Sequence, residues 1–187
     1  MQEAGVQANS VTYNTVVNAC ARAGDAAGAE EWVRKMEAAG FKADLMSYNS
    51  LINACAKAGN PDKAQEWLCQ MRKCGIRPDH ISYTTAVHAC LVAKEPLRAA
   101  EVLEEMLKFQ ERPSGACLAA LIQAFADDEK PREASRWLEF AVGSSIEFRP
   151  VTYRKVSGAW AREGNVEEAD RWAAAGQLKV STGDIRP

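Results

Sequence analysis

The stretch Val11-Thr12-Tyr13-Asn14 returns along the chain at a spacing of 35 residues or a multiple of 35. Its clear later copies are Met46-Ser47-Tyr48-Asn49, Ile81-Ser82-Tyr83-Thr84 and Val151-Thr152-Tyr153-Arg154. One further copy, Ala116-Cys117-Leu118-Ala119, keeps the apolar character and loses the tyrosine. A fixed period of about 20–50 residues indicates an architecture of stacked repeats.

The repeated stretch defines five consecutive units of 35 residues: 10–44, 45–79, 80–114, 115–149 and 150–184. The first two units are identical at 14 of 35 positions, whereas the fourth is degenerate. Residues 1–9 keep the register and are predicted to be the tail of a truncated preceding repeat. Residues 150–187 hold the fifth repeat and a truncated C-terminal end. We expect these units to form one continuous solenoid domain.

Each unit has the pattern of two helices joined by a short turn. Apolar residues of the first half follow the spacing of one helical face, as at Val16, Val17, Cys20 and Ala21. An alanine marks the second half of every unit: Ala29, Ala64, Ala99, Ala134 and Ala169. A helical hairpin cannot bury both of its apolar stripes alone, so neighbouring hairpins must stack. The predicted fold class is all-α, a right-handed α-solenoid of about five helix-turn-helix repeats with ten main helices.

The composition excludes several classes of protein. The chain has 187 residues, 47% of them hydrophobic and 26% charged, which is typical of a globular protein and not of a disordered one. No apolar run approaches the roughly 18 residues of a membrane span, so we expect no direct membrane insertion. The first residues lack the basic start and apolar stretch of a targeting segment. The formal net charge of −2 gives no bulk attraction to nucleic acid.

The opening (V/I/M)-(T/S)-Y-N, the alanine of the second helix and the closing G-(I/F)-(K/R)-(P/A)-D resemble the pentatricopeptide repeat family. Tetratricopeptide repeats are the nearest alternative, but their period is about 34 and their tryptophan lies early in the first helix. The resemblance covers essentially the whole chain. It implies binding of single-stranded RNA, one base per repeat. It also implies a mitochondrial or chloroplast location.

The resemblance further implies which side chains read the bases. In the family, the residue after the tyrosine and the last residue of the same unit together select the base. Asn14 with Asp44, and Asn49 with Asp79, match the combination that favours uracil. An amide can donate to and accept from a pyrimidine edge, while a carboxylate can orient that amide. The RNA partner is therefore expected to be U-rich.

The remaining units match the family pattern less well. Thr84 with Ser114 is a partial match to the purine-reading pairs. Two further pairs depart from the pattern and imply no base: Ala119 with Arg149, and Arg154 with Asp184.

Other residues are implied to hold the base and the phosphate. The family sandwiches each base between aliphatic side chains at the start of the first helix, the place of Val11, Met46 and Ile81. Packing between helices is the alternative interpretation of these three residues. Arg22 and Lys57 occupy places from which they could approach phosphates, although solvated surface charges would fit equally well.

No combination of catalytic or metal-ligating residues stands out. Cys20, Cys55 and Cys90 are spaced by the repeat itself, which favours core thiols over a ligand set. Core packing is also predicted for the tryptophans of the second helices: Trp32, Trp67, Trp137 and Trp172. We predict that the chain is not an enzyme by itself and that it uses no cofactor, metal or small-molecule substrate.

Two functions fit these features. The first is sequence-selective binding of single-stranded RNA in organellar RNA metabolism, favoured by Asn14 and Asn49 because packing alone does not require them. The alternative is an architectural or protein-binding subunit of a larger organellar complex, such as a ribosome or a membrane complex. The low charge and the degenerate readout pairs favour that alternative. We also predict a division of labour, in which residues 10–84 form the RNA-facing end and residues 115–187 serve as a spacer or protein-docking surface. Phe140, Phe148 and Trp160 are then either anchors of that surface or buried core residues.

Overall fold

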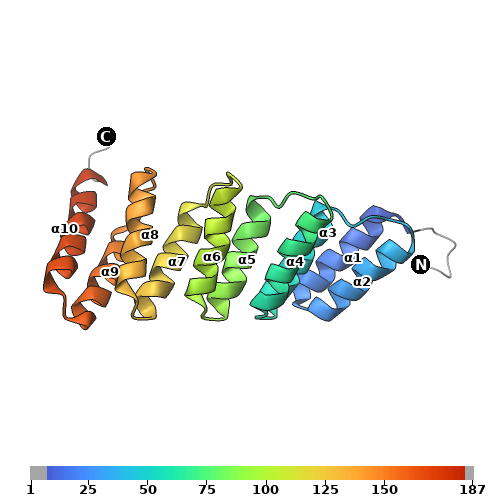
Figure 1. Ribbon diagram of the computed structural model, residues 1–187, viewed down its shortest axis with the longest axis horizontal. Coiled ribbons are helices and arrows are strands. Elements are labelled where there is room, and N and C mark those ends of the chain that lie inside the picture. The colour runs from blue at the N-terminus through green and yellow to red at the C-terminus, as the bar shows by residue number, and fades with distance from the viewer. Residues whose placement is uncertain (1–7, 184–187) are drawn as a thin grey trace. The chain divides into compact units, whose positions relative to one another are not determined.

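The structure is a computed structural model that describes residues 8–183 (Figure 1). These residues form helices and no strand, in agreement with the predicted all-α fold class. The helices are α1 Ser10–Ala23, α2 Ala26–Ala38, α3 Leu45–Lys57, α4 Pro61–Lys73, α5 His80–Val92, α6 Pro96–Lys108, α7 Gly115–Asp127, α8 Pro131–Gly143, α9 Pro150–Glu163 and α10 Val166–Gly183. The odd-numbered helices are the first helices of the repeats and the even-numbered ones are the second helices.

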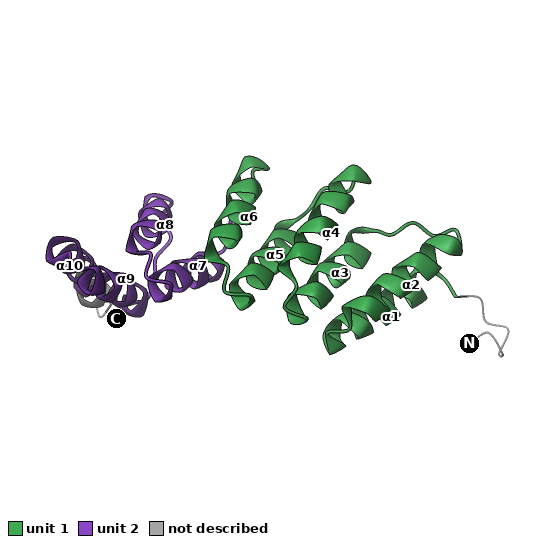
Figure 2. Cartoon of the chain, turned by 60° about the horizontal axis from the view of Figure 1, so that its bottom comes forward, with its two compact units in different colours: residues 1–112 green, residues 113–187 purple. Residues whose placement is uncertain are grey.

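The chain divides into two compact units, Met1–Arg112 with α1 to α6 and Pro113–Pro187 with α7 to α10 (Figure 2). In the first unit α1 packs on α2 and α3, and α3 packs on α4 and α5. In the second unit α7 packs on α8 and α9, and α9 packs on α10. Within each compact unit a first helix thus contacts its own partner and the next first helix of that unit, which is the packing of a helical repeat solenoid. The exact repeat limits and the handedness of the solenoid stay predictions.

The helices begin where their capping residues dictate. The side chains of Asn9, Asp44 and Asp79 each accept a hydrogen bond from the backbone N–H three residues later. The hydroxyl of that later residue accepts one from the backbone N–H of the capping residue. Such a reciprocal cap satisfies two of the backbone donors that a helix start leaves open. Prolines at the first position start the second helices of the second, third and fourth repeats: Pro61, Pro96 and Pro131.

The core consists of the apolar stripes of both helices. The alanine common to all five second helices is buried in each of them, four times completely. Three tryptophans of the second helices face the tyrosine of the same hairpin, as Trp67 does with a ring-centroid distance of 6.1 Å to Tyr48, whereas Trp137 contacts Phe140. Trp137 and Trp172 are buried, whereas Trp32 and Trp67 are half-buried against the edge of the core. These rings therefore serve hairpin packing, as predicted.

The helix ends reveal strain in the third and fourth repeats. Gly24, Gly59 and Gly164 end the first helices of the other repeats with positive φ angles, where glycine has no steric penalty. Lys94 and Glu129 occupy the same place with φ angles of 60° and 54°. A side chain with a Cβ atom is disfavoured in this left-handed region.

Replacing Lys94 by glycine is therefore expected to stabilise the chain by about 0.5–1 kcal/mol, because the left-handed backbone is kept and the Cβ clash is removed. The free energy of urea unfolding measures the gain. Lys94→Ala is the matched control, since it removes the same charge and keeps the Cβ atom. An equal gain in both variants would assign the effect to charge and contradict the strain.

Replacing the buried Ala64 by leucine is expected to lower the free energy of unfolding by about 1–3 kcal/mol, because the close approach of α4 leaves no room for three more carbon atoms. Ala27→Leu places the same side chain at an exposed position of α2 and should leave the stability nearly unchanged. Equal urea midpoints for the two variants would show that Ala64 is not a packing constraint.

Candidate nucleic-acid interface

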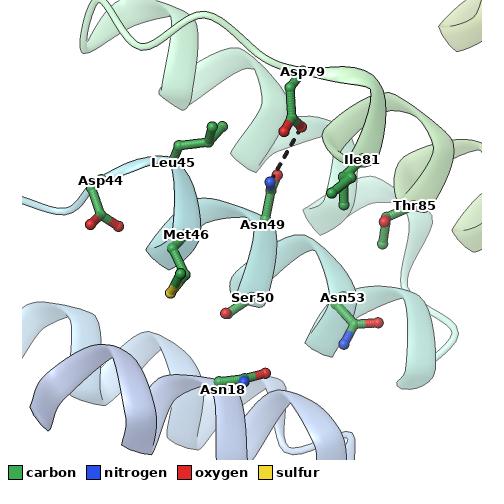
Figure 3. Close-up of a pocket in the computed structure, with 10 residues that line it drawn as sticks. All are labelled: Asn18, Asp44, Leu45, Met46, Asn49, Ser50, Asn53, Asp79, Ile81 and Thr85. Carbon is green, nitrogen blue, oxygen red and sulfur yellow. Dashed lines mark hydrogen bonds between the residues drawn. The ribbon is translucent and has the colours of Figure 1, made fainter. Parts of the chain in front are cut away.

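Asn49, on the second turn of α3, is held by two polar side chains of the following segment. Its Nδ2 donates to Oδ1 of Asp79 at 3.3 Å, drawn as a dashed line in Figure 3. The hydroxyl of Ser82 donates to its Oδ1 at 2.6 Å. Both ends of the amide therefore have a fixed protein partner, and the orientation of the amide is set.

The same network lies one repeat earlier. Nδ2 of Asn14 donates to both carboxylate oxygens of Asp44, at 3.2 and 3.1 Å. The hydroxyl of Ser47 donates to Oδ1 of Asn14 at 2.6 Å. The structure thus brings together both pairs that the resemblance implies for uracil.

Helix capping explains why the carboxylate stands there. Asp79 is the N-cap of α5, and its Oδ1 accepts the backbone N–H of Ser82 at 2.9 Å. The backbone N–H of Asp79 in turn donates to the hydroxyl of Ser82 at 3.2 Å. The cap holds the side chains of Asp79 and Ser82 in the positions where Asn49 bonds to them. The hydrogen-bond network therefore joins two successive repeats.

Both aspartates are held in the ionised form. Partial burial alone would raise the pKa of Asp44 and of Asp79. The hydrogen bonds from the backbone N–H and hydroxyl of the capping serine, together with the asparagine amide, outweigh it and hold each pKa below its usual value. At neutral pH each carboxylate accepts hydrogen bonds and donates none.

A groove of about 690 Å³ runs past Asn49 in the first unit (Figure 3). Its lining comes from α1, α3, α5 and the residues that cap them: Asn18, Asp44, Leu45, Met46, Asn49, Ser50, Asn53, Asp79, Ile81 and Thr85. Figure 3 shows Asn49 between Met46 on one side and Ile81 on the other. The groove therefore offers a polar centre flanked by two aliphatic side chains.

The aliphatic residues expected to sandwich a base are all exposed. Val11 is 68% exposed, Met46 62% and Ile81 59%. Large aliphatic side chains that packed between helices would be buried, so the packing alternative is wrong for these three residues. Their role toward a base stays a prediction.

The two asparagines differ in accessibility. Asn49 is half-buried and lines the groove, whereas Asn14 is only 7% exposed and does not. Sequence reasoning missed two further amides of the groove, Asn18 and Asn53. Their signal was present, because both stand at the same repeat position and neither is required by the apolar stripe.

The three later pairs differ from these two. Thr84 lies on α5 in the first unit, and Ser114 caps α7 in the second, so that pair stays a prediction. Ala119 carries no hydrogen-bonding group for Arg149. Asp184, the expected partner of Arg154, lies outside the described residues.

The two candidate phosphate contacts are both exposed, but one of them has another partner. The ammonium of Lys57 donates to the backbone carbonyl of Arg22 at 2.9 Å, which ties the end of α3 to the end of α1. In the second unit Arg162 makes the equivalent bond, to the carbonyl of Ala126 at 2.7 Å. Contact of Arg22 or Lys57 with phosphate stays a prediction.

Cys55 and Cys90, two of the three repeat-spaced thiols, are buried in the core. Burial raises the pKa of the Cys55 and Cys90 thiols to about 11, so both are protonated at neutral pH. Within residues 8–183, no group of three or more histidine, cysteine, aspartate or glutamate side chains could hold a metal ion. None of the described helices is long and apolar enough to cross a membrane.

Two of the expected protein-docking anchors are buried. Phe148 and Trp160 lie in the core of the second unit, and the indole Nε1 of Trp160 donates to the hydroxyl of Ser135 at 2.8 Å. Both rings are packing residues, so their assignment as docking anchors is wrong. Phe140 is exposed.

The sequence matches two models of one repeat family. The PPR repeat family matches residues 8–57 and 43–92, and the pentatricopeptide repeat domain matches residues 68–128. Together the matches span residues 8–128, more than half of the chain. The chain belongs to the pentatricopeptide repeat family. A search of curated protein sequences finds no match.

Solved structures share the fold. The pentatricopeptide repeat protein PPR10 from maize has a TM-score of 0.80 and 23% identity, over 94% of this chain and 26% of PPR10. PPR10 in complex with an 18-nt psaJ RNA element has a TM-score of 0.70 and 24% identity, over 97% and 27%. The PPR domain of Arabidopsis thaliana protein-only RNase P 1 in complex with tRNA has a TM-score of 0.73 and 15% identity, over 88% and 86%. This chain spans about a quarter of the length of PPR10.

Proposed function

We propose that the chain binds single-stranded RNA and that its first unit selects uracil. One observation carries the proposal: the amide of Asn49, oriented by Asp79 and Ser82, stands in an open groove between two exposed aliphatic side chains. A core packing role requires neither the orientation nor the exposure. Asn14 repeats the hydrogen-bond network one repeat earlier, at a buried position outside the groove.

The chemistry of the oriented amide favours uracil. One N–H of Asn49 is used by Asp79 and one oxygen lone pair by Ser82, which leaves one donor and one acceptor. Uracil presents a matching N3–H donor beside a carbonyl acceptor. Cytosine presents the reverse, an N3 acceptor beside an amino donor, and would need the amide turned over. The ionised carboxylate of Asp79 prevents that turn, because it can only accept.

The flanking side chains fit the faces of a base. Met46 and Ile81 lie on opposite sides of Asn49 and expose most of their surface (Figure 3). A base placed between them would bury apolar surface on both faces while its edge meets the amide. Because any base has two such faces, the aliphatic residues supply affinity and the asparagine supplies selection.

The comparisons support RNA as the class of ligand. One structure of PPR10 holds an 18-nt RNA element, and the PPR domain of protein-only RNase P 1 was solved with tRNA. Members of the family generally act in organelles, so we place the RNA in a mitochondrion or chloroplast. We propose no catalytic step for the chain, since no catalytic constellation accompanies the groove.

The expected affinity is low. Each competent base contact contributes about 1–3 kcal/mol, and association costs an estimated 4–15 kcal/mol. Two such contacts therefore give a Kd that is micromolar or weaker. Preference between RNA sequences, and not affinity itself, is the quantity that tests the proposal.

Replacing Asn49 by alanine is expected to lower the preference for oligo-U over oligo-A by about 5-fold or more, since one two-point base contact discriminates by about 1–3 kcal/mol. Competition binding at fixed salt measures the ratio. Asn53→Ala, which removes an amide from the same groove, should keep the wild-type ratio. An unchanged ratio in Asn49→Ala would contradict base reading by this side chain.

Replacing Asp79 by asparagine is expected to lower the preference for oligo-U over oligo-C by about 5-fold, because an amide neighbour can donate or accept and lets Asn49 turn over. Asparagine caps helices as well as aspartate does, so α5 should keep its start. Asp25→Asn makes the same change at the N-cap of α2, outside the groove, and should leave the preference unchanged. A variant at Asp79 that still rejects oligo-C would show that the carboxylate does not set the orientation.

A further inference from the structure

The first helix of the fifth repeat carries positive charge where the groove of the first unit carries a carboxylate and an amide. Arg149 and Arg154 stand 105 residues, three repeats, after Asp44 and Asn49. In α3 both of those positions line the groove. In α9 the same two positions therefore belong to the corresponding face of the second unit.

Both arginines are exposed and unengaged. In the described part of the chain, no hydrogen bond or ion pair joins the side chain of Arg149 or of Arg154 to another residue. The neighbouring Lys155 differs, since its ammonium is paired with Asp127 at 2.8 Å. Two permanent cations thus stand free on one helix, at positions that the repeat directs to the ligand-facing side.

This face has lost the means to read a base and keeps an apolar surface. Ala119, the partner of Arg149 in the repeat register, has no hydrogen-bonding side chain. Val151 takes the place of Met46 and is 45% exposed. An exposed aliphatic side chain at this position is a feature shared with the base groove, and a surface for an acidic peptide would not require it.

We propose that the second unit binds the phosphate backbone of single-stranded RNA through Arg149 and Arg154, whatever the base. The guanidinium group is always charged, and its planar set of N–H donors matches two phosphate oxygens at once. The proposal rests on RNA binding as proposed above, and it assigns the two units different tasks. The first selects sequence, and the second supplies affinity that depends on salt.

The test compares the double variant Arg149→Gln, Arg154→Gln with wild type across a salt series, using oligo-U and oligo-A of equal length. Each phosphate contact on a single strand contributes about 0.7 to the slope of log K against log salt, so the slope should flatten by about 1.4. The ratio of the RNA affinity of the wild type to that of the variant should therefore fall about 7-fold between 50 and 200 mM salt. Both oligonucleotides should lose affinity by the same factor.

Two further variants separate charge at this face from charge in general. Lys73→Gln with Arg132→Gln removes two exposed cations from the second helices and should leave the slope unchanged. Arg149→Lys with Arg154→Lys keeps the charges and should keep the wild-type slope. Thermal unfolding followed by circular dichroism verifies that all variants fold alike.

Several results overturn the inference, and they differ from failure of uracil selection. A slope in the double glutamine variant equal to that of the control, or a loss confined to one oligonucleotide, contradicts phosphate binding by this face. Binding of an acidic oligoglutamate peptide that needs both arginines, with RNA binding unaffected, assigns the face to a protein instead. A wild type that binds both oligonucleotides equally, with the arginine effect intact, refutes uracil selection alone. No RNA binding by the wild type refutes both proposals.

Discussion

The hydrogen bond between the last residue of one repeat and the fifth residue of the same repeat is the interaction on which the site depends. Asp79 makes it possible because it also caps α5, where the backbone of the next repeat holds its carboxylate in place. One side chain thereby starts a helix, joins two repeats and orients the amide of Asn49. In the first two repeats this bond favours a fixed repeat length, since an inserted residue would separate the cap from the amide.

Much of this architecture could be predicted from the repeat alone. The helices follow from the period and the pattern within it, whereas the pairing of Asn49 with Asp79 was implied by the family resemblance. The link from Ser82 to Asn49 could not be predicted, because a hydroxyl that caps a helix shows nothing in the sequence of its second partner. The tie from Lys57 to the carbonyl of Arg22 was hidden for the same reason.

The burial of individual side chains could not be predicted from the sequence either. Phe148 and Trp160 have the same apolar character as an exposed anchor, and only the packing of α9 against its neighbours decides between the two roles. Val11 and Met46 show the opposite outcome, since a repeat pattern that places aliphatic residues at a helix start does not tell which side they face. Periodicity shows which residues occupy equivalent positions in different repeats, whereas the exposure of each side chain depends on the helices packed around it.

The double duty of the capping position restricts how such a protein can evolve. Asp44, Asp79 and Ser114 each cap a helix with a side-chain oxygen, and Arg149 leaves α9 without a side-chain cap. Short polar residues are the only side chains that cap well. Backbone chemistry therefore limits this position, which we propose takes part in base selection, to a few residue types. A repeat with any other residue type at this position loses the proposed base selection and also the side-chain cap of the helix that follows.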